Sequence, residues 1–431
     1  MNRRAESNHA LEFAAAAANE AGLPLVCYEG LTCAYPHAGD RFHTFILEGV
    51  PEMRRSLAKR GIGYVFHLRR RRTDPDNALY RMAERAAAVV TDDYPAFLTP
   101  GYNAGVAAKL AAPFHVVDAS CIVPMGLVPK REWAAYTIRP KIRKLLPRYL
   151  KPVEPVKLKR RFSGKLPPLD TEVTRAGIPE LVACCEIDHS VAPSRRFPGG
   201  RKDAEAALTR FLEERLRRYA REKNEPSAHA TSDLSPYLHF GRIGALEVAL
   251  AVEEYAGEHK LIAAEFLEEL IVRRELAFNF CRYTEQPHAF AALPDWARQT
   301  LAEHARDRRD PVFPRAAFEE ARTYDALWNA AQKELLATGK IHGYARMYWG
   351  KKIIEWSANP EEALETAVFL NDRYALDGRD PNSYANILWC FGLHDRPWPE
   401  RPIFGKVRWM SLAGMRRKTD AEAYIRETGV L

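Results

Sequence analysis

The pattern of hydrophobic residues changes along the chain, and this change constrains the fold more than any other feature. Up to about residue 120, short apolar runs rich in β-branched residues alternate with amphipathic segments, as in PLVCYE (24–29), HTFILEGVPEMRRSLAKR (43–60) and GYVFHL (63–68). This alternation is typical of βαβ units on a parallel sheet. From about residue 203 onward the pattern is helical nearly throughout. The sequence therefore predicts an α/β domain followed by an all-α domain.

The predicted α/β domain opens on a helix. Such domains usually begin with a strand, but this chain begins with ESNHALEFAAAAANEAG (6–22), for which Gly22 is the expected C-terminal stop. Further helix and strand segments follow near residues 76–88, 88–93 and 114–119. We therefore expect a Rossmann-like parallel sheet whose first strand is missing. Because that strand lies near the middle of such a sheet, its absence would expose the edges of its neighbours.

Composition and pattern together divide the chain into three regions. Residues 1–125 form the predicted α/β domain, residues 126–202 a basic, proline-rich connection with some local helix, and residues 203–431 the helical domain. With 431 residues, of which 47% are hydrophobic, the chain can bury two cores. The basic run within the connection is typical of a solvated segment, and an arm that contacts phosphates is the alternative.

Charge and cysteine usage restrict the partners and the compartment. The formal net charge of +8 gives a positive surface field, which favours an anionic partner. The seven cysteines include no CxxC pair, so we expect reduced thiols, no zinc or other metal site and a cytoplasmic protein. No apolar run is long enough to cross a bilayer and the N-terminus lacks the apolar core of a signal peptide, so we expect no membrane association.

Residues 341–356, IHGYARMYWGKKIIEW, place Trp349 and Trp356 seven residues apart. On a helix this spacing puts both rings on one face, roughly 10 Å apart. Core packing is the usual reason for such a pair. A row of redox-active side chains is the alternative, and this stretch alone leaves both open.

A second stretch combines polar groups with a helix start. In TSDLSPYLHFG (231–241), Ser235 is the expected N-cap and Pro236 the expected first helical residue. Free N–H groups and hydroxyls at a helix N-terminus also bind phosphate well. Most such motifs are only caps, so both interpretations stay open here.

Two charged pairs lie in the helical region. In LNDRYALDGRDPNSY (370–384), Asp377 would pair with Arg346 if the two segments meet, and a buried pair of this kind can orient a cofactor. A solvated turn is the alternative. In FLEELIVRRE (266–275), Glu269 stands four residues before Arg273, which ordinary helix pairing explains.

The C-terminal stretch ERPIFGKVRWMSLAGMRRKTD (400–420) interleaves basic residues with Phe404 and Trp409. A surface that grips a phosphate backbone and offers rings to bases has this composition. The pattern indicates nucleic-acid binding without being specific for it.

Taken together, these stretches resemble the class II cyclobutane pyrimidine dimer photolyases of the photolyase/cryptochrome family. The resemblance is densest from about 231 to 420, where TSDLSPYLHFG, FLEELIVRRE, LWNA, GKIHGYARMYWGKKIIEW, LNDRYALDGRDPN and ERPIFGKVRWM occur in order. RRAESNHAL and AAYTIRPKI carry a weaker resemblance in the first 140 residues to the family's antenna domain. The resemblance implies a deoxyribodipyrimidine photolyase, a carbon–carbon lyase that contains FAD and splits pyrimidine dimers in UV-damaged DNA with light. We expect it to act as a monomer, and whether an antenna chromophore binds stays open.

The resemblance also implies site residues. The hydroxyls of residues 231–235 would hold the FAD, Asn371 would face its N5, and the full set is Tyr219, Thr231, Ser232, Asp233, Leu234, Ser235, Arg346, Asn371 and Asp377. An inward electron relay would use Trp349, Trp328 and Trp356. Glu269 would hydrogen-bond the dimer, in a pocket lined by Met347 and Trp389. Arg396 and Arg408 would contact phosphates.

One position departs from the pattern of the family. Some class II enzymes have a tryptophan where this chain has Arg273, so one wall of the lesion pocket would be cationic here, although arginine can also stack on a base. Two other functions stay open. A cryptochrome-like photoreceptor would keep FAD and the relay without repair, and a flavin-free relic would only bind nucleic acid.

Overall fold

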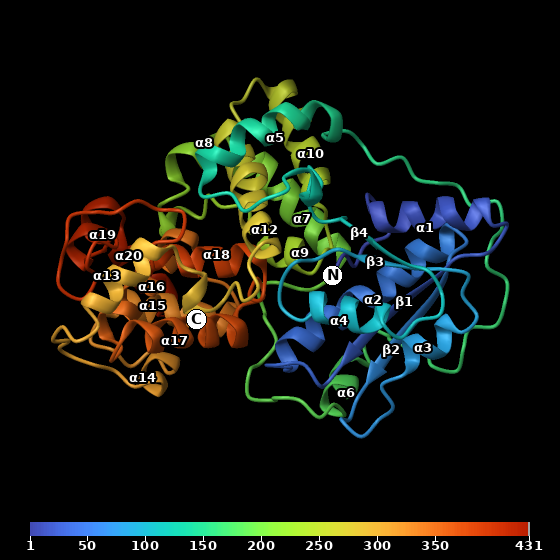
Figure 1. The fold of residues 1–431 in the computed structure, drawn as a ribbon, viewed down its shortest axis with the longest axis horizontal. Helices are drawn as coiled ribbons and strands as arrows, with labels where there is room; N and C mark the ends of the chain where they lie inside the picture. Colours follow the sequence, from blue (N-terminus) through green and yellow to red (C-terminus); the bar gives the residue numbers. More distant parts are fainter. Residues whose placement is uncertain (430–431) are drawn as a thin grey trace. The chain divides into compact units, whose positions relative to one another are not determined.

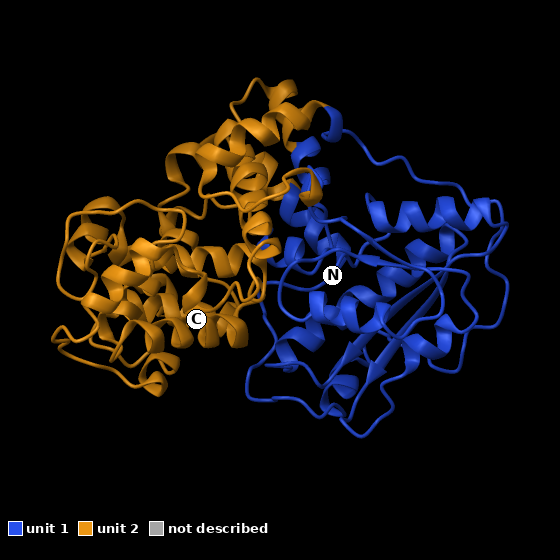
Figure 2. Cartoon of the chain, viewed as in Figure 1, with its two compact units in different colours: residues 1–124, 148–208, 234–251 blue, residues 125–147, 209–233, 252–431 orange. Residues whose placement is uncertain are grey.

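The computed structural model describes residues 1–429 of the chain, which separates into two compact units (Figure 2). Unit 1 comprises Met1–Pro124, Arg148–Leu208 and Leu234–Ala251. Unit 2 comprises Met125–Pro147, Thr209–Asp233 and Val252–Leu431. The stretch 126–202, predicted as a connection, is therefore shared between the units: its first part belongs to unit 2 and the rest to unit 1.

Unit 1 contains the strands that the sequence predicted (Figure 1). They are β1 (Val26–Thr32), β2 (Gly63–Arg69), β3 (Val89–Asp92) and β4 (Phe114–Val117). The helices of this unit are α1 (His9–Glu20), α2 (Asp40–Lys59), α3 (Ala78–Ala83), α4 (Thr99–Ala107), α6 (Ile178–Ala183), most of α7 (Arg201–Arg210), α9 (Ser235–His239) and the first half of α10 (Ala245–His259). Asn8 caps α1, and Gly22 follows it with a φ of +66°. The predicted α/β alternation is confirmed, with α3 shorter than expected.

The sheet of unit 1 is divided. In the described chain, β1 pairs in parallel with β2, with Val26 opposite Gly63, and β3 pairs in parallel with β4, with Val89 opposite Phe114. In a doubly wound sheet, the first strand lies between the strands that correspond here to β1 and β3. The division therefore falls where the missing first strand was expected.

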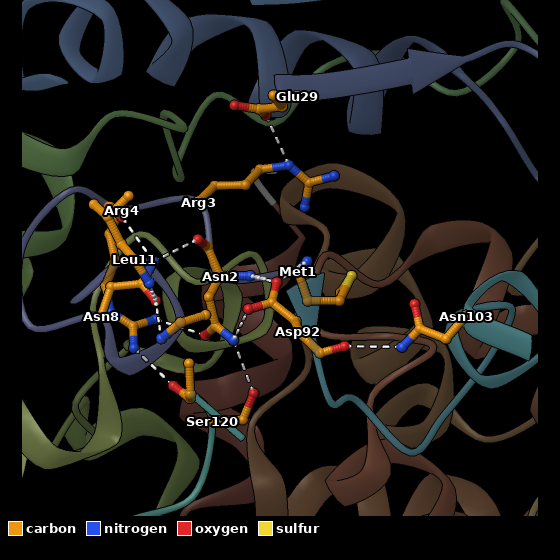
Figure 3. A network of polar contacts seen from close by, with 12 residues as sticks. Met1, Asn2, Arg3, Arg4, Asn8, Leu11, Glu29, Asp92, Asn103 and Ser120 are labelled. Carbon is orange, nitrogen blue, oxygen red and sulfur yellow. Dashed lines mark hydrogen bonds and ion pairs between the residues drawn. The ribbon is translucent and has the colours of Figure 1, made fainter. Parts of the chain in front are cut away.

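Residues 1–3 link the two halves of the sheet through polar contacts (Figure 3). The Met1 amino group and the Asn2 side chain contact the Asp92 carboxylate at the end of β3, at 2.7 and 3.0 Å. Arg3 Nε donates to Glu29 Oε1 in β1 at 2.9 Å. Burial alone would raise the pKa of Asp92, but the Met1 ammonium and the Asn2 donors lower it to about 2. Polar contacts of residues 1–3 thus connect β1 and β3.

Unit 2 is helical, as predicted. Its elements are η1 (Met125–Leu127), most of α5 (Ala135–Tyr149), η2 (Phe211–Arg215), α8 (Leu216–Glu222), η3 (Pro226–Ala228), the rest of α10, α11 (Ala264–Leu267), η4 (Glu268–Arg273), α12 (Arg274–Arg282), η5 (Phe290–Ala292), α13 (Asp295–Glu303), α14 (Arg315–Glu319), α15 (Ala326–Thr338), α16 (Gly343–Trp356), α17 (Pro360–Tyr374), α18 (Pro381–Cys390), α19 (Leu412–Lys418) and α20 (Ala421–Thr428). Among residues 1–429, no helix combines the length and apolar character that crossing a bilayer requires.

The core of unit 2 is built around α16, which packs against α15, α17 and α18. Local signals begin and end these helices. Asp325 accepts a bond from Trp328 N at 3.0 Å and caps α15, and Gly339, with a φ of +81°, ends it. Asn359 accepts from Glu362 N at 2.8 Å and caps α17. These four helices carry the three predicted relay tryptophans together with Arg346, Met347, Asn371 and Trp389.

Candidate functional site

Three buried tryptophans form a continuous row in unit 2. Trp328 lies on α15, and Trp349 and Trp356 lie two turns apart on α16. The rings of Trp328 and Trp349 are parallel to within 5° with centroids 6.3 Å apart, and the centroids of Trp328 and Trp356 are 6.2 Å apart. All three residues are at most 1% exposed. Trp328 therefore lies between the two tryptophans of α16.

Hydrogen bonds fix two rings of this row, and the third ring approaches the surface. Trp328 Nε1 donates to Trp349 O at 3.0 Å, and Trp349 Nε1 donates to Gln332 Oε1 at 2.9 Å. The Trp356 ring centroid is 5.1 Å from that of Tyr324, which is 64% exposed. The row thus leads from the interior of unit 2 to a phenol in contact with solvent, which is the arrangement that an inward electron relay needs.

The segments that carry Arg346 and Asp377 meet, and the two side chains form an ion pair. Arg346 Nη2 donates to Asp377 Oδ1 at 2.8 Å, and the side chains are 13% and 11% exposed. A solvated turn, the alternative for Asp377, does not occur. Arg346 precedes Trp349 by three residues on α16, so the pair and the tryptophan row are one helical turn apart.

Asn371 is held in one orientation near the C-terminal end of α17. Its Nδ2 donates to Ser383 Oγ at 2.6 Å and to Asp372 Oδ1 at 2.9 Å, and the residue is 3% exposed. Asp372 also accepts a bond from the Tyr384 hydroxyl at 3.0 Å. Burial raises the pKa of Asp372. These contacts set the direction of the Asn371 amide.

The loop 231–235 is anchored through Asp233. Arg215 Nη1 and Lys340 Nζ each donate to the Asp233 carboxylate at 3.0 Å, and Asp233 is 8% exposed with a φ of +58°. Arg215 also donates to Thr231 O at 2.8 Å. Two cations therefore meet one carboxylate beside this loop, and the excess positive charge of these three groups would attract an anionic ligand.

The start of the following helix differs from the prediction. The N-cap is Leu234, Ser235 is the first residue of α9, and the helix ends at His239. The unit boundary falls after Asp233, so Ser232 belongs to unit 2 and Ser235 to unit 1. A helix of five residues has too few aligned peptide units to supply the dipole expected for a phosphate site. The positive charge beside the loop comes from Arg215 and Lys340 instead.

His342 presents a buried donor without a partner. Its Nδ1 accepts from Tyr344 N at 3.2 Å, which caps α16 and leaves the proton on Nε2. Among the described residues, Nε2 is buried and has no hydrogen-bond partner. Such a group needs an acceptor. The vacant donor fits a polar ligand such as a cofactor oxygen.

We expect the titration of His342 to weaken the fold in acid. Burial, then the Lys340 charge, lowers its pKa from 6.5 to about 3, with smaller effects from Asp233, His229 and Arg346. Between these values the unfolded chain binds a proton that the folded chain does not, so the free energy of unfolding falls as pH falls, by up to about 1.4 kcal/mol per pH unit.

The substitution His342→Asn keeps an acceptor for the cap and removes this titration. Denaturant unfolding followed across that pH range should therefore show a shallower fall for the variant than for the parent. Equal slopes would show that His342 is not buried in its neutral form.

Glu269 pairs with a lysine and not with Arg273. Lys223 Nζ contacts Glu265 at 2.8 Å and Glu269 at 3.0 Å, and it lies 5.8 Å from the ring centroid of Tyr219. Helix spacing predicted that Glu269 would pair with Arg273, but Glu269 pairs with Lys223 instead. Glu269 and Arg273 both lie in η4, which is a π-helical segment, and such segments are frequent at functional sites. Lys223 therefore lies near both Tyr219, which was predicted to bind FAD, and Glu269, which was predicted to bind the dimer.

Two of the residues predicted at the lesion pocket, Arg273 and Trp389, lie against each other. The Arg273 guanidinium lies 5.7 Å from the ring centroid of Trp389, and Arg273 Nε is buried without a partner among the described residues. Trp389 is on α18, and the Sγ of Cys390, the next residue, contacts Met347 O at 3.8 Å. The Arg273 guanidinium therefore lies over the Trp389 ring, within range of a cation–π contact.

Arg396 and Arg408 meet at an indole that the sequence analysis did not include. Their guanidinium carbons lie 5.4 and 5.1 Å from the ring centroid of Trp398. Phe404, expected to offer its ring to bases, is only 4% exposed, so this expectation is wrong. Trp409 is 38% exposed, and the guanidinium carbon of Arg401 lies 4.0 Å from its ring centroid.

Several side chains that hold these residues were not predicted from the sequence. Lys223, Gln332, Lys340 and Ser383 contact predicted residues from positions distant along the chain. Their residue types carry no local signal. Trp398 did have a local signal in the sequence, because it stands two residues before the basic and aromatic stretch 400–420.

Comparisons with known proteins agree on one family. The sequence model of the DNA photolyase family, described as "DNA photolyase", matches residues 2–158. The deoxyribodipyrimidine photo-lyase of Methanothermobacter thermautotrophicus is 41% identical, over 98% of this chain and 91% of its own. That of Potorous tridactylus is 36% identical, over 99% and 79%. The archaeal photolyase from Sulfolobus tokodaii, solved with two FAD molecules, superimposes with a TM-score of 0.69 at 16% identity, over 99% of this chain and 87% of its own.

Proposed function

Because the chain belongs to the deoxyribodipyrimidine photo-lyase family of enzymes, we propose that it repairs cyclobutane pyrimidine dimers in UV-damaged DNA with light, as a class II photolyase with bound FAD. The observation that carries this proposal is the row of three buried tryptophans beside the Arg346–Asp377 pair. A flavin enzyme that must be reduced in place needs such a row. Core packing alone does not need the buried ion pair one turn away.

We propose that residues 203–431 hold FAD and DNA, and that residues 1–125 form an antenna-type domain. The residues of unit 2 fit a flavin with a pyrophosphate. Arg215 and Lys340 supply positive charge, the vacant Nε2 of His342 supplies a donor, and the Arg346–Asp377 pair supplies an oriented charge for a ring system. Tyr219, the hydroxyls of Thr231 and Ser232, and Asn371 complete the proposed site.

Bound FAD, when reduced and excited by light, supplies the electron that opens the dimer. The residues of the chain prepare this reaction. The tryptophan row conducts an electron inward from Tyr324 and the surface. Glu269 hydrogen-bonds the dimer and steadies the charge on its carbonyl groups. Asn371, whose amide is fixed by Ser383 and Asp372, would hold the cofactor with its free amide oxygen.

The lesion reaches this site by leaving the duplex. A pyrimidine dimer stacks and pairs poorly, so its extrusion costs less than that of intact bases. The extruded dimer is received by a pocket formed by Trp389, Met347 and the guanidinium of Arg273. Both the indole and the planar cation can stack on a base. Arg396 and Arg408, held on Trp398, contact phosphates without reading sequence. We therefore expect affinity for DNA to fall steeply with salt.

Repair of a duplex oligonucleotide that contains one thymine dimer tests this function. After expression with ample flavin, the purified protein should be coloured and should remove the dimer under blue light but not in the dark. Glu269→Ala should retain flavin and lower the repair rate. A flavin-bound protein that leaves dimers intact in light would act as a photoreceptor, and a colourless protein that binds DNA would be a flavin-free relic. Either result would refute the proposal.

A further inference from the structure

A cavity of about 380 Å³ opens in unit 2, and of the site residues described above it shares only Arg396. Residues from three parts of the chain line it: the segment before and at the start of α5, the start of α13, and the segment after α18. The lining residues used below are Arg131, Trp133, Tyr136, Trp296, His394 and Arg396. Pockets for small ligands start at roughly 300 Å³, so this volume suits one nucleotide better than a pair.

The walls of this cavity are aromatic and unusually exposed. Trp133 is 65% exposed and Tyr136 is 71% exposed, and Trp296 contributes a third ring. Large aromatic side chains left open to water on a rigid surface are typical of binding sites. Every nucleobase has a flat face that stacks on such rings, and this stacking is tolerant of sequence.

The backbone that carries Trp133 is fixed from both sides. Asn279, 3% exposed on α12, accepts a bond from Glu132 N at 2.7 Å and donates to Lys130 O at 2.9 Å. His394 Nδ1 donates to Trp133 O at 2.6 Å. The exposed indole is therefore presented by an ordered segment, and little freedom would be lost when a ligand binds.

The charge at the cavity suits an anionic ligand. Arg131 donates to Ala292 O at 2.9 Å and lies 4.9 Å from the ring centroid of Phe280, while its Nε is buried without a partner among the described residues. Arg396 is exposed at the mouth. The Asp395 carboxylate is already bonded to Arg396 N at 2.8 Å and to Trp398 Nε1 at 3.3 Å. Two guanidinium groups thus place positive charge at the cavity.

The cavity also lies close to the proposed lesion pocket. Arg273 and Phe280 are seven residues apart along η4 and α12, a distance of roughly 10 Å. Arg131 contacts Phe280, and the Phe280 and His394 ring centroids are 5.8 Å apart. A DNA strand held at one place would therefore pass near the other.

We propose that this cavity is a second nucleotide subsite, in which Trp133, Tyr136 and Trp296 stack one unpaired base of DNA while Arg131 and Arg396 face its phosphate. The proposal rests on the repair function, because extrusion of a dimer leaves the bases opposite it without partners. Stacking such a base against the protein keeps the duplex open during repair. The subsite thus takes a base from the strand opposite the dimer.

Fluorescence of 2-aminopurine tests this subsite. The analogue is bright when unstacked and is quenched by stacking on an indole. With 2-aminopurine opposite the dimer, the flavin-loaded parent should bind with low emission, and Trp133→Ala should bind with emission raised several-fold. Trp133→Phe should restore quenching in part. The same label in a paired position away from the dimer should report no difference between variants.

The affinity for dimer-containing duplex gives a second readout. Loss of one base–aromatic contact is worth roughly 1–3 kcal/mol, so Trp133→Ala should weaken binding about 5- to 150-fold. Flavin content, photoreduction and the repair rate at saturating DNA should not change, and thermal unfolding should confirm that the exposed substitution leaves the fold intact. Unchanged emission and unchanged affinity in Trp133→Ala would overturn the subsite while leaving repair intact. A parent that neither binds nor repairs dimers would overturn the proposed function itself.

Discussion

Trp328→Phe should slow photoreduction of the bound flavin by an order of magnitude or more. Phenylalanine is far harder to oxidise than tryptophan, and Trp328 is the ring that lies between Trp349 and Trp356, with centroid distances of 6.3 and 6.2 Å. Without it, an electron must cross the roughly 10 Å that separates the two rings of α16 in one step. Absorbance of the oxidised flavin under blue light, with an external reductant present, measures the rate.

Chemical reduction separates a relay from a structural role. Trp328→Phe removes the bond to Trp349 O and leaves a small cavity, so thermal unfolding must be measured alongside. If the row only conducts electrons, the variant reduced by dithionite should repair dimers at the parent rate. A variant that photoreduces as fast as the parent would show that the three rings are core packing and nothing more.

Asp377→Asn should destabilise the protein by about 3 kcal/mol and lower its flavin content. The substitution keeps the shape and removes the charge that faces Arg346, whose side chain is only 13% exposed. A buried cation that loses its partner is costly, because water cannot replace the lost interaction. Denaturant unfolding of the flavin-free protein measures the first effect, and the ratio of flavin to protein absorbance measures the second.

Asp295→Asn is the matched control for this prediction. Asp295 pairs with Arg298 at 2.5 Å, but it is 94% exposed, and exposed pairs contribute little. This variant should unfold as the parent does and should keep its flavin. If Asp377→Asn behaves in the same way, the Arg346–Asp377 pair is neither a stabilising contact nor part of a cofactor site.

Local sequence patterns determined the fold class and the elements that carry the candidate site residues. Alternating periodicity gave the strands of unit 1, and Gly22 ended the first helix with a positive φ as expected. The spacing of Trp349 and Trp356 placed both rings on one face of α16. Such features depend on residues a few positions apart, so a linear reading can find them. The spacing rule for α-helices fails in the π-helical segment η4. There it predicted Arg273 as the partner of Glu269, whose partner is Lys223.

Only the tertiary structure decided which distant residues meet. Nothing near Trp328 in the sequence places it between two rings of the next helix, and nothing near Lys223 assigns it to Glu269. The sequence predicted the Arg346–Asp377 pair only on the condition that the two segments meet. The structure shows that α16 and the segment after α17 do meet. Contacts of this kind depend on how whole helices pack, and packing is set by the combined shape and burial of many side chains. The sequence by itself determined the elements and their chemistry, and the three-dimensional packing decided their partners.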